Sequence, residues 1–345
     1  MRNAICRICG DAGPKKLYMV KEMMFGMRDE FEYFECGSCG CLQIADIPRD
    51  ISKYYPSKYS SFRVPEFAKK AIRDNFIMRY LRHKRTEYIL GRKGIIGMLA
   101  STIRPAGKTL SEHLGWLKEC GADLDSKILD VGCGNGNLLL ELSWYGFKDL
   151  TGVDLYIKGD IAYANGVRIF KRDLYGMESP YDMVMFHHSF EHMADPIVVL
   201  QKARKLLAPH GYVLVRIPTV SSYAWTVYGV NWAQIDAPRH FFLHSLKSIG
   251  LAADKAGLRI KKILFDSNDF QFRGSEQYKR GIPLFDERSY YINARNSVFS
   301  EEEVRSFVAK ADELNRNKTG DAICVYMMKK ENAKNAVTEK VIDGV

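Results

Sequence analysis

The chain has 345 residues, of which 46% are hydrophobic, and it carries a formal net charge of +10. This length predicts one large domain or two modest ones, and the apolar fraction suffices for a full core without disulfide staples. No run of about 18 consecutive apolar residues occurs, so we expect no transmembrane helix. Residues 1–6 lack the apolar stretch of a secretory signal, which predicts a cytoplasmic protein.

The positive charge is concentrated in the N-terminal third. Residues 1–110 contain 21 Lys and Arg and 11 Asp and Glu, a difference of 10, and the rest of the chain holds 30 of each. Such a region suits an anionic partner: a phosphate-linked or nucleotide-linked substrate, an anionic membrane surface or RNA. The alternative is a solvated basic helix without a partner.

Five of the eight cysteines lie within the first 41 residues. Two Cys-x-x-Cys-Gly motifs, Cys6 to Cys9 and Cys36 to Cys39, can each present two thiolates to one tetrahedral ion. The 26 residues between them can form a hairpin. We therefore predict that residues 1–45 form a small β-rich, zinc-ribbon-like module with a structural Zn(II). Cys41 is a spare or alternative ligand, and a redox pair or unmetallated thiols are the other interpretations.

Residues 46–107 are predicted to contain a linker and a basic amphipathic helix. The linker, 46–62, is rich in Tyr, Ser, Pro and Lys, and a helical pattern extends from about 65 to 91, with Ile72, Phe76 and Tyr80 at four-residue spacing. A basic amphipathic helix can contact a membrane peripherally, here through residues 65–93, although packing on its own domain is commoner. Its basic residues are Arg73, Arg79, Arg82, Lys84, Arg85, Arg92 and Lys93.

From residue 108 to 330 helical and strand-like segments alternate, which predicts an α/β domain with a doubly wound, mostly parallel sheet. Helices are expected at 111–120, 137–144, 196–207 and 301–314. An insertion around 266–320 is expected to include a loop or lid over the site, and residues 331–345 are expected to form a polar tail. The expected strands are 127–131, 150–153, 167–170, 183–186, 212–217, 259–265 and 322–328.

A glycine-rich turn follows the first of these strands. Gly132, Gly134 and Gly136 follow Asp130 in the spacing Gly-x-Gly-x-Gly, which differs from the Gly-x-Gly-x-x-Gly of dinucleotide folds. A preceding carboxylate suits the amino-acid end of S-adenosylmethionine (SAM), which carries an ammonium group.

Two further aspartates end the second and third strands of this domain. Asp154, about 20 residues after the glycines, is placed to accept hydrogen bonds from ribose hydroxyls. Asp173 is placed to accept one from an adenine amino group. The alternative for each aspartate alone is a helix cap or turn.

Together these residues resemble the class I SAM-dependent methyltransferases over roughly residues 110–330. The resemblance implies a seven-stranded Rossmann-like sheet with its last strand antiparallel, and a SAM site in which Asp130 and the glycines line the methionine part. The predicted cofactor site comprises Asp130, Gly132, Gly134, Gly136, Asp154, Leu155, Asp173, Leu174 and His187.

The fourth strand leads into residues 186–196, which in this family face the transferring methyl group. The segment resembles the small-molecule branch and lacks the Asn/Asp-Pro-Pro-Tyr/Phe signature of nucleic-acid amino methylases. Methyl transfer requires positioning and removal of one proton, a task that suits histidine. The candidate bases are His240, His188, His187 and His192, and the alternative for a strand-end histidine is a structural role.

A second segment, residues 232–241, resembles an Asp-x-Pro-Arg-His stretch of polysaccharide and sugar methyltransferases. Tyr223 and Trp225 are predicted to stack on a sugar, and Arg239 to hold a phosphate or carboxylate bidentately. The alternative is a loop packed on the sheet edge, with Arg239 paired to Asp236.

The predicted enzyme therefore methylates a small molecule at oxygen or carbon, most simply an anionic sugar, nucleotide-linked or carried on a lipid or polysaccharide. A zinc module before such a domain resembles sugar C-methyltransferases and a family of rRNA guanine methyltransferases. The alternatives are an RNA methyltransferase, in which the zinc module and basic helix bind RNA, and a non-catalytic SAM-binding scaffold.

Overall fold

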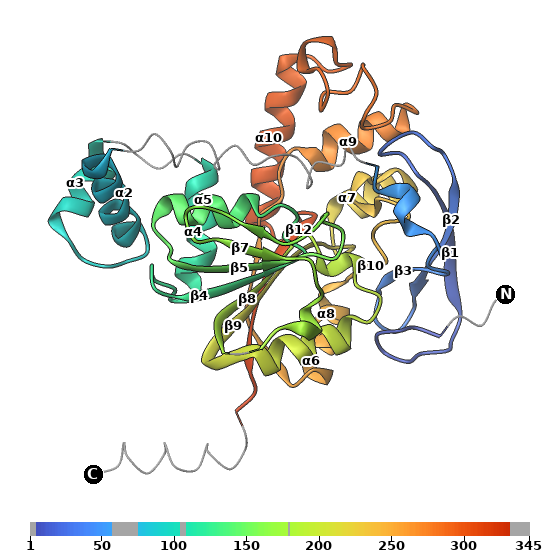
Figure 1. Cartoon of the computed structure of the whole chain (residues 1–345). Coiled ribbons are helices and arrows are strands. Elements are labelled where there is room, and N and C mark those ends of the chain that lie inside the picture. The colour runs from blue at the N-terminus through green and yellow to red at the C-terminus, as the bar shows by residue number, and fades with distance from the viewer. Residues whose placement is uncertain (1–4, 57–74, 104–107, 179, 332–345) are drawn as a thin grey trace.

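The computed structural model describes residues 5–56, 75–103, 108–178 and 180–331 (Figure 1). Its centre is an eight-stranded sheet in the order β11-β12-β9-β8-β4-β5-β7-β6. The strands are β4 (Lys127–Val131), β5 (Asp149–Val153), β6 (Ile161–Ala162), β7 (Arg168–Phe170), β8 (Tyr181–His187), β9 (Leu207–Pro218), β11 (Leu258–Phe265) and β12 (Ala322–Lys329).

The strand directions confirm the predicted sheet. Strands β7, β5, β4, β8 and β9 are parallel, and β12 is antiparallel to both β9 and β11. All seven predicted strands are present, with the last one antiparallel. The eighth, β6, pairs antiparallel with β7 at the sheet edge; its two residues are too few for a hydrophobic period to reveal it.

Successive side chains of the parallel strands enter two different cores, as the period of two requires. Leu129 and Val131 of β4 belong to a core with helices α6 (Pro196–Leu206) and α8 (Leu246–Lys255). Ile128 belongs to a second core with α4 (Lys108–Glu119) and α5 (Asn137–Tyr145). Helices thus cover both faces of the sheet, so the doubly wound arrangement is confirmed (Figure 1).

The segment 266–320 contains α9 (Phe270–Lys279), η8 (Ala294–Asn296) and α10 (Glu301–Arg316). Helix α10 confirms the predicted helix, and Ser300 and Glu303 form a capping box at its start. The backbone amides of Leu284 and Phe285 donate to the carbonyls of Met23 and Met24 in the N-terminal module. The segment therefore buttresses that module at the side of the molecule.

The N-terminal module is a β-hairpin, as its spacing predicted, extended by two short strands. Strands β1 (Lys15–Lys21) and β2 (Glu30–Cys36) pair antiparallel, and the sheet continues through β3 (Leu42–Ile44) to β10 (Phe242–Leu243). Because β10 comes from the predicted α/β domain, the two predicted domains share one sheet (Figure 1).

The described residues between 46 and 103 form η1 (Ile51–Tyr54), α2 (Phe76–Ile89) and α3 (Ile95–Ile103). Helix α2 confirms the predicted helical pattern over its own length, whereas residues 65–74 of that prediction lie outside the described residues. Helix α3 was not predicted. The remaining elements are η4 (Leu174–Gly176), η5 (Phe190–His192), α7 (Tyr223–Tyr228), η6 (Gly229–Asn231) and η7 (Ala233–Ile235).

Helices α2 and α3 pack closely on each other. A Cβ at Gly97 of α3 would lie 2.4 Å from the carbonyl oxygen of Lys84 in α2, so only glycine permits this approach. The Arg82 guanidinium lies 3.6 Å from the Trp144 ring centroid and donates to the Trp144 carbonyl, which attaches the pair to α5.

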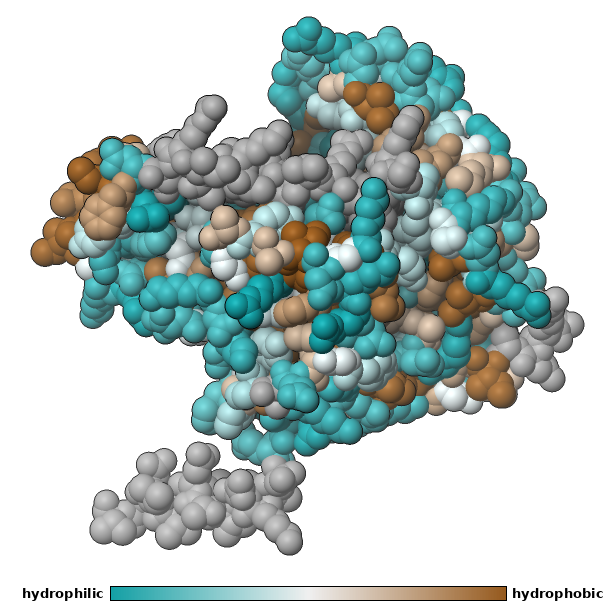
Figure 2. Space-filling model, viewed as in Figure 1, coloured by the Kyte–Doolittle hydropathy of each residue, from teal (hydrophilic) through white to brown (hydrophobic). Residues whose placement is uncertain are grey.

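Several large apolar side chains of this pair face outward instead of packing on the domain, whereas Ile89 packs against the second core. Phe76 is 71% exposed, Ile95 73% and Ile103 84%. Figure 2 shows hydrophobic residues gathered over α2 and α3 at one end of the molecule. Within the described residues, no helix is long and apolar enough to cross a membrane.

Candidate active site

A cavity of about 360 Å³ opens at the carboxyl ends of β4, β5, β7 and β8, where ligands of open α/β sheets bind. It joins strand ends that extend in sequence from Val131 of β4 to His187 of β8, 56 residues apart. It is lined by Tyr55, Val131, Gly132, Val153, Asp154, Leu155, Tyr156, Arg172, Asp173, Leu174, Tyr175, His188, Ser189, His192, Met193, Ala194, Asp195, Val199 and Phe241.

Gly132 forms the turn at the end of β4. Its φ is +75°, and a Cβ there would lie 2.5 Å from the Cβ of Ser189. Ser189 in turn donates a hydrogen bond to the carbonyl of Val131, with an Oγ–O distance of 2.5 Å. A side chain at position 132 is therefore excluded twice, by the backbone conformation and by the neighbouring strand end.

The other two predicted glycines lie behind the cavity wall. The Gly134 amide donates to Asp154 Oδ2 at 2.9 Å, which ties the glycine turn to the tip of β5. Gly136, with φ of +79°, precedes α5, and a Cβ there would lie 2.7 Å from Ile169. These two glycines thus shape the turn from behind.

Asp154 and Asp173 both lie on the cavity wall, together with Leu155 and Leu174. The Asp154 Oδ1 accepts from the Tyr156 amide at 2.8 Å, so both of its oxygens are oriented by backbone donors. Asp173 Oδ1 accepts from the amides of Tyr175 and Gly176 and caps η4, as the turn interpretation anticipated. A capping carboxylate still has Oδ2 directed elsewhere, so this role and a place in a binding site are compatible.

Asp130 is buried at the end of β4, directly before Val131 and Gly132 of the cavity wall. Burial raises the pKa of its carboxyl group to about 7, and the negative charge of Asp154 adds to this effect. Within the described part of the chain, its Oδ1 has no hydrogen-bond partner. A cationic ligand group placed next to this buried carboxyl group would stabilise its ionised form.

Three aromatic or basic side chains at the cavity escaped the sequence reasoning. The rings of Tyr55 and Tyr156 stack with centroids 5.3 Å apart and planes inclined by 12°, and Arg172 also lines the wall. Tyr156 follows Asp154 by two residues, so its closeness in sequence to a predicted site residue could have indicated a place at the cavity. Tyr55 lies in the linker after the cysteine module, and only the tertiary structure brings it to the cavity.

The four candidate histidines divide into two pairs. His188 and His192 line the cavity. His187 instead contacts Trp116, with ring centroids 4.9 Å apart, and burial, assisted by the positive charge of Arg216, lowers its pKa well below the usual value. His240 is buried behind His192, at 4.8 Å between ring centroids, and burial lowers its pKa to about 4.

The segment 232–241 corrects one prediction. Arg239 is fully buried, and its guanidinium donates to both oxygens of Asp236, to the carbonyl of Tyr54 and to Glu22. With these partners it has no access to a phosphate of a substrate. The alternative, a packed loop with Arg239 paired to Asp236, describes the structure.

This loop fastens the N-terminal module to the main domain. The Arg239–Glu22 ion pair, at 2.9 Å and with both side chains 0% exposed, joins the loop to the end of β1. The Tyr33 hydroxyl of β2 donates to the His240 carbonyl at 2.8 Å. Sequence reasoning missed Glu22 because nothing in a single acidic residue after a strand indicates a partner more than 200 positions away.

Tyr223 and Trp225 lie on α7, outside the set of residues that line the cavity. Trp225 packs edge-on against Tyr18 of β1, with centroids 5.1 Å apart. Tyr223 is partly exposed, with the Lys310 ammonium 5.6 Å from its ring centroid. Their predicted contact with a sugar is therefore not made at this cavity.

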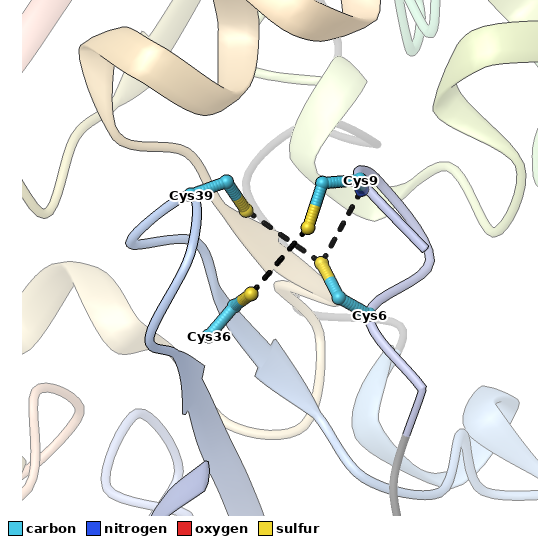
Figure 3. Close-up of side chains that lie close together, drawn as sticks. All are labelled: Cys6, Cys9, Cys36 and Cys39. Atoms are coloured by element: carbon cyan, nitrogen blue, oxygen red, sulfur yellow. Dashed lines mark hydrogen bonds between the residues drawn. The ribbon is translucent and has the colours of Figure 1, made fainter. Parts of the chain in front are cut away.

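The four predicted cysteines converge (Figure 3). The Sγ atoms of Cys6 and Cys39 are 3.6 Å apart and those of Cys9 and Cys36 are 3.5 Å apart. Sulfurs bound tetrahedrally to zinc at about 2.3 Å would be separated by roughly 3.8 Å, whereas a disulfide requires about 2 Å. The donor set and its spacing therefore fit a zinc ion. Cys41 is buried outside this group.

Comparison with known proteins shows similarity to methyltransferases. A family model described as a methyltransferase domain matches residues 100–263. A ubiquinone biosynthesis O-methyltransferase of Bordetella avium (strain 197N) is 32% identical over 166 residues, covering 42% of this chain and 68% of that protein. A protein of the same name from Pseudomonas aeruginosa (strain UCBPP-PA14) is 26% identical over 44% of this chain and 72% of its own length.

Among solved structures, a mycolic acid cyclopropane synthase complexed with SAH and CTAB aligns with a TM-score of 0.42 and 15% identity. The alignment covers 64% of this chain and 85% of that one.

Proposed function

Because the chain belongs to the class I SAM-dependent methyltransferases, we propose that it transfers the methyl group of SAM to a hydroxyl oxygen of a small-molecule acceptor. The observation that carries the proposal is the convergence of Gly132, Asp154 and Asp173 on one cavity that also contains His188 and His192. Oxygen is favoured over carbon because the sequence relatives are named O-methyltransferases.

We propose that each of the three aspartates binds a different part of SAM. Asp154 accepts from the ribose hydroxyls and Asp173 from the adenine amino group, since both lie on the cavity wall. Asp130 lies one residue before the wall and compensates the ammonium group of the methionine part. Gly132 allows the backbone to approach the cofactor without a side chain between them.

In the proposed reaction the acceptor oxygen bonds to the methyl carbon as the bond from that carbon to the sulfonium sulfur breaks, and the hydroxyl proton leaves to a base. His192 is suited to be this base because its Nδ1 lies 2.8 Å from the Arg239 carbonyl oxygen. A carbonyl only accepts, so Nδ1 carries the proton and Nε2 keeps a lone pair. His188 is the second candidate at the cavity.

We propose that the methylated group is a hydroxyl on a ring, which can belong to either of two kinds of acceptor. The basic N-terminal third favours an anionic sugar, nucleotide-linked or carried on a lipid or polysaccharide. The names of the sequence relatives, which refer to ubiquinone biosynthesis, favour an aromatic ring hydroxyl.

The test is transfer of a radiolabelled methyl group from SAM to a panel of nucleotide sugars, phenols and total RNA, after SAM binding has been measured by calorimetry. We expect micromolar binding of SAM and label in the sugar or the phenol fraction. Label confined to RNA would instead establish the RNA methyltransferase alternative, and failure to bind SAM would overturn the proposal.

We propose that the four-cysteine cluster binds a structural zinc ion. The Gln43 side chain donates to Cys6 Sγ at 2.9 Å, and the Lys15 ammonium lies 3.9 Å from Cys36 Sγ. Donors and a positive charge of this kind stabilise thiolates, which are the form that binds metal. All four protein ligands are present, so the ion has no open position for catalysis.

We also propose that the helix pair α2–α3 binds an anionic membrane surface. Apolar side chains of both helices are exposed in one patch, and basic residues occur on α2. A peripheral helix of this kind inserts its apolar side chains and places its basic ones at the lipid phosphates.

Cosedimentation with vesicles tests the membrane proposal. We expect binding to vesicles containing phosphatidylglycerol, little binding to pure phosphatidylcholine, and loss of binding in the double variant Phe76→Ser, Ile95→Ser. The matched control is Val198→Ser, an exposed apolar residue on α6. Self-association that the double variant abolishes, without vesicle binding, would show that the patch contacts a second copy instead.

A further inference from the structure

A buried carboxylate lies directly behind the cavity wall. Glu191, in η5, is 0% exposed, and neither of its oxygens has a hydrogen-bond partner among the described residues. Its Oε1 lies 3.4 Å from His188 Nδ1 and 3.8 Å from His240 Nε2. Burying an ionised carboxylate is costly unless a cation, a hydrogen-bond donor or a metal ion compensates it.

Two histidines next to Glu191 are held in one tautomer. The Nδ1 atoms of His192 and His240 lie 2.8 Å and 2.7 Å from the carbonyl oxygens of Arg239 and Gln234. Each Nδ1 therefore carries a hydrogen, and each Nε2 presents a lone pair. Metal-binding histidines are characteristically fixed in this way, with the remaining ring nitrogen donating to a carbonyl or carboxylate.

The three residues are already close enough to share an ion. One potential ligand atom from each of Glu191, His192 and His240 lies within 4.8 Å of the others. Metal–ligand bonds of about 2.0–2.2 Å hold ligand atoms no more than roughly 4.4 Å apart. Small rotations of these side chains therefore suffice, without movement of the backbone.

We infer that Glu191, His192 and His240 form a binding site for a divalent transition-metal ion, in addition to the four-cysteine site. Two imidazole nitrogens and one carboxylate oxygen are a donor set that suits Zn²⁺, Mn²⁺, Fe²⁺ or Co²⁺. His192 belongs to the cavity wall, whereas Glu191 and His240 lie behind it. The protein would supply three ligands to the ion, of which His192 also lines the cavity.

This site gives the histidines a different role from that of a base. An ion held by these residues would stabilise the oxyanion of an acceptor hydroxyl group, whose proton would leave to solvent. The oxygen would then bond to the methyl carbon of SAM as the carbon–sulfur bond breaks. This role rests on the proposed methyl transfer, whereas the binding of the metal does not.

The competing arrangement needs no metal. Glu191 would serve as the counter-ion of a protonated histidine, and His188, at 3.4 Å, is the nearest candidate. The two arrangements differ in the number of metal ions that the protein retains, which can be counted without any assay of activity.

The experiment is metal analysis of the full-length protein after loading with Zn²⁺ or Mn²⁺ and gel filtration, for the wild type, Glu191→Gln and His192→Asn. We expect two retained zinc equivalents in the wild type and one in each variant, with the one held by the cysteines. The control is His244→Asn, which alters a buried imidazole of the same region outside the cluster and should retain two. Circular dichroism verifies that each variant is folded.

One retained equivalent in the wild type, unchanged by Glu191→Gln and His192→Asn, would overturn the inference. Calorimetry of SAM binding separates this failure from that of the proposed function. A wild type that binds and turns over SAM with one metal equivalent retains the proposed function and loses the second metal site. A wild type with two equivalents that does not bind SAM retains the metal site and loses the proposed function.

Discussion

Two regions of this molecule carry charged residues at the ends of strands and short helices. In one region these residues face a cavity, and in the other they pair with each other in the interior. At the edge of the central sheet, Asp154 and Asp173 face a cavity and are oriented by backbone amides. In the segment 232–241, Asp236 and Arg239 face inward and compensate each other. The comparison teaches that residue type selects the possible partners, while exposure decides whether the partner is a ligand or another part of the chain.

The largest expected effect is the loss of stability when the cysteine module loses its metal ion. We expect Cys39→Ser to lower the denaturation midpoint strongly, because zinc binding contributes on the order of 10 kcal/mol to small zinc modules. Since β3 pairs with β10, the effect should extend into the main domain. Cys120→Ser, outside the cluster, is the control. An unchanged midpoint in Cys39→Ser would show that the cluster is not a structural metal site.

The next largest effect concerns the buried ion pairs of Arg239. Arg239→Ala leaves Glu22 and Asp236 buried without their cation, so we expect the free energy of unfolding to fall by about 3–5 kcal/mol. Arg172→Ala, at the exposed cavity wall, should change stability by less than about 0.5 kcal/mol. Urea denaturation monitored by circular dichroism measures both. If Arg239→Ala were as stable as the wild type but bound the acceptor more weakly, Arg239 would be a substrate-binding residue after all.

A smaller effect is expected at the cavity itself. Asp154→Ala should weaken SAM binding by about 1–3 kcal/mol, as for the loss of a charged hydrogen-bond acceptor. Isothermal titration calorimetry measures the change, with the exposed Asp254→Ala as control. Unaltered affinity in Asp154→Ala would remove this residue from the cofactor site.

A further effect is a pH dependence of stability that originates in Asp130. Its folded-state pKa of about 7 lies above the value of about 4 expected for an unfolded aspartate. Between these pH values the folded protein holds a proton that the unfolded chain has released. Without ligand, stability should therefore fall as pH rises from about 4 to 7, by at most about 1.4 kcal/mol per pH unit.

The same residue predicts a proton released on binding. An ammonium group near Asp130 favours its ionised form, so SAM binding below about pH 7 should release part of a proton. Calorimetry in two buffers of different ionisation enthalpy measures the release, and Asp130→Asn should abolish it. Identical proton release in wild type and Asp130→Asn would show that another group titrates.

The sequence by itself determined the features that depend on local spacing. Short apolar runs between helical segments predicted all seven main strands, because strands covered on both faces are buried on both sides. The Cys-x-x-Cys-Gly spacing predicted the cluster, because a short loop presents both sulfurs to the same side. The order of glycines and aspartates predicted the cavity edge, because parallel strands end on one side of a sheet.

Only the tertiary structure decided what depends on distant partners. Arg239 became a structural residue because Glu22 and the carbonyl of Tyr54 lie against it. Tyr55 reached the cavity because the module is fixed to the main domain through β10. Glu191, His192 and His240 came together because a turn after β8 and a loop before β10 meet in space. Contacts of this kind leave no periodic signal, since the residues concerned are single positions whose environment is set by packing.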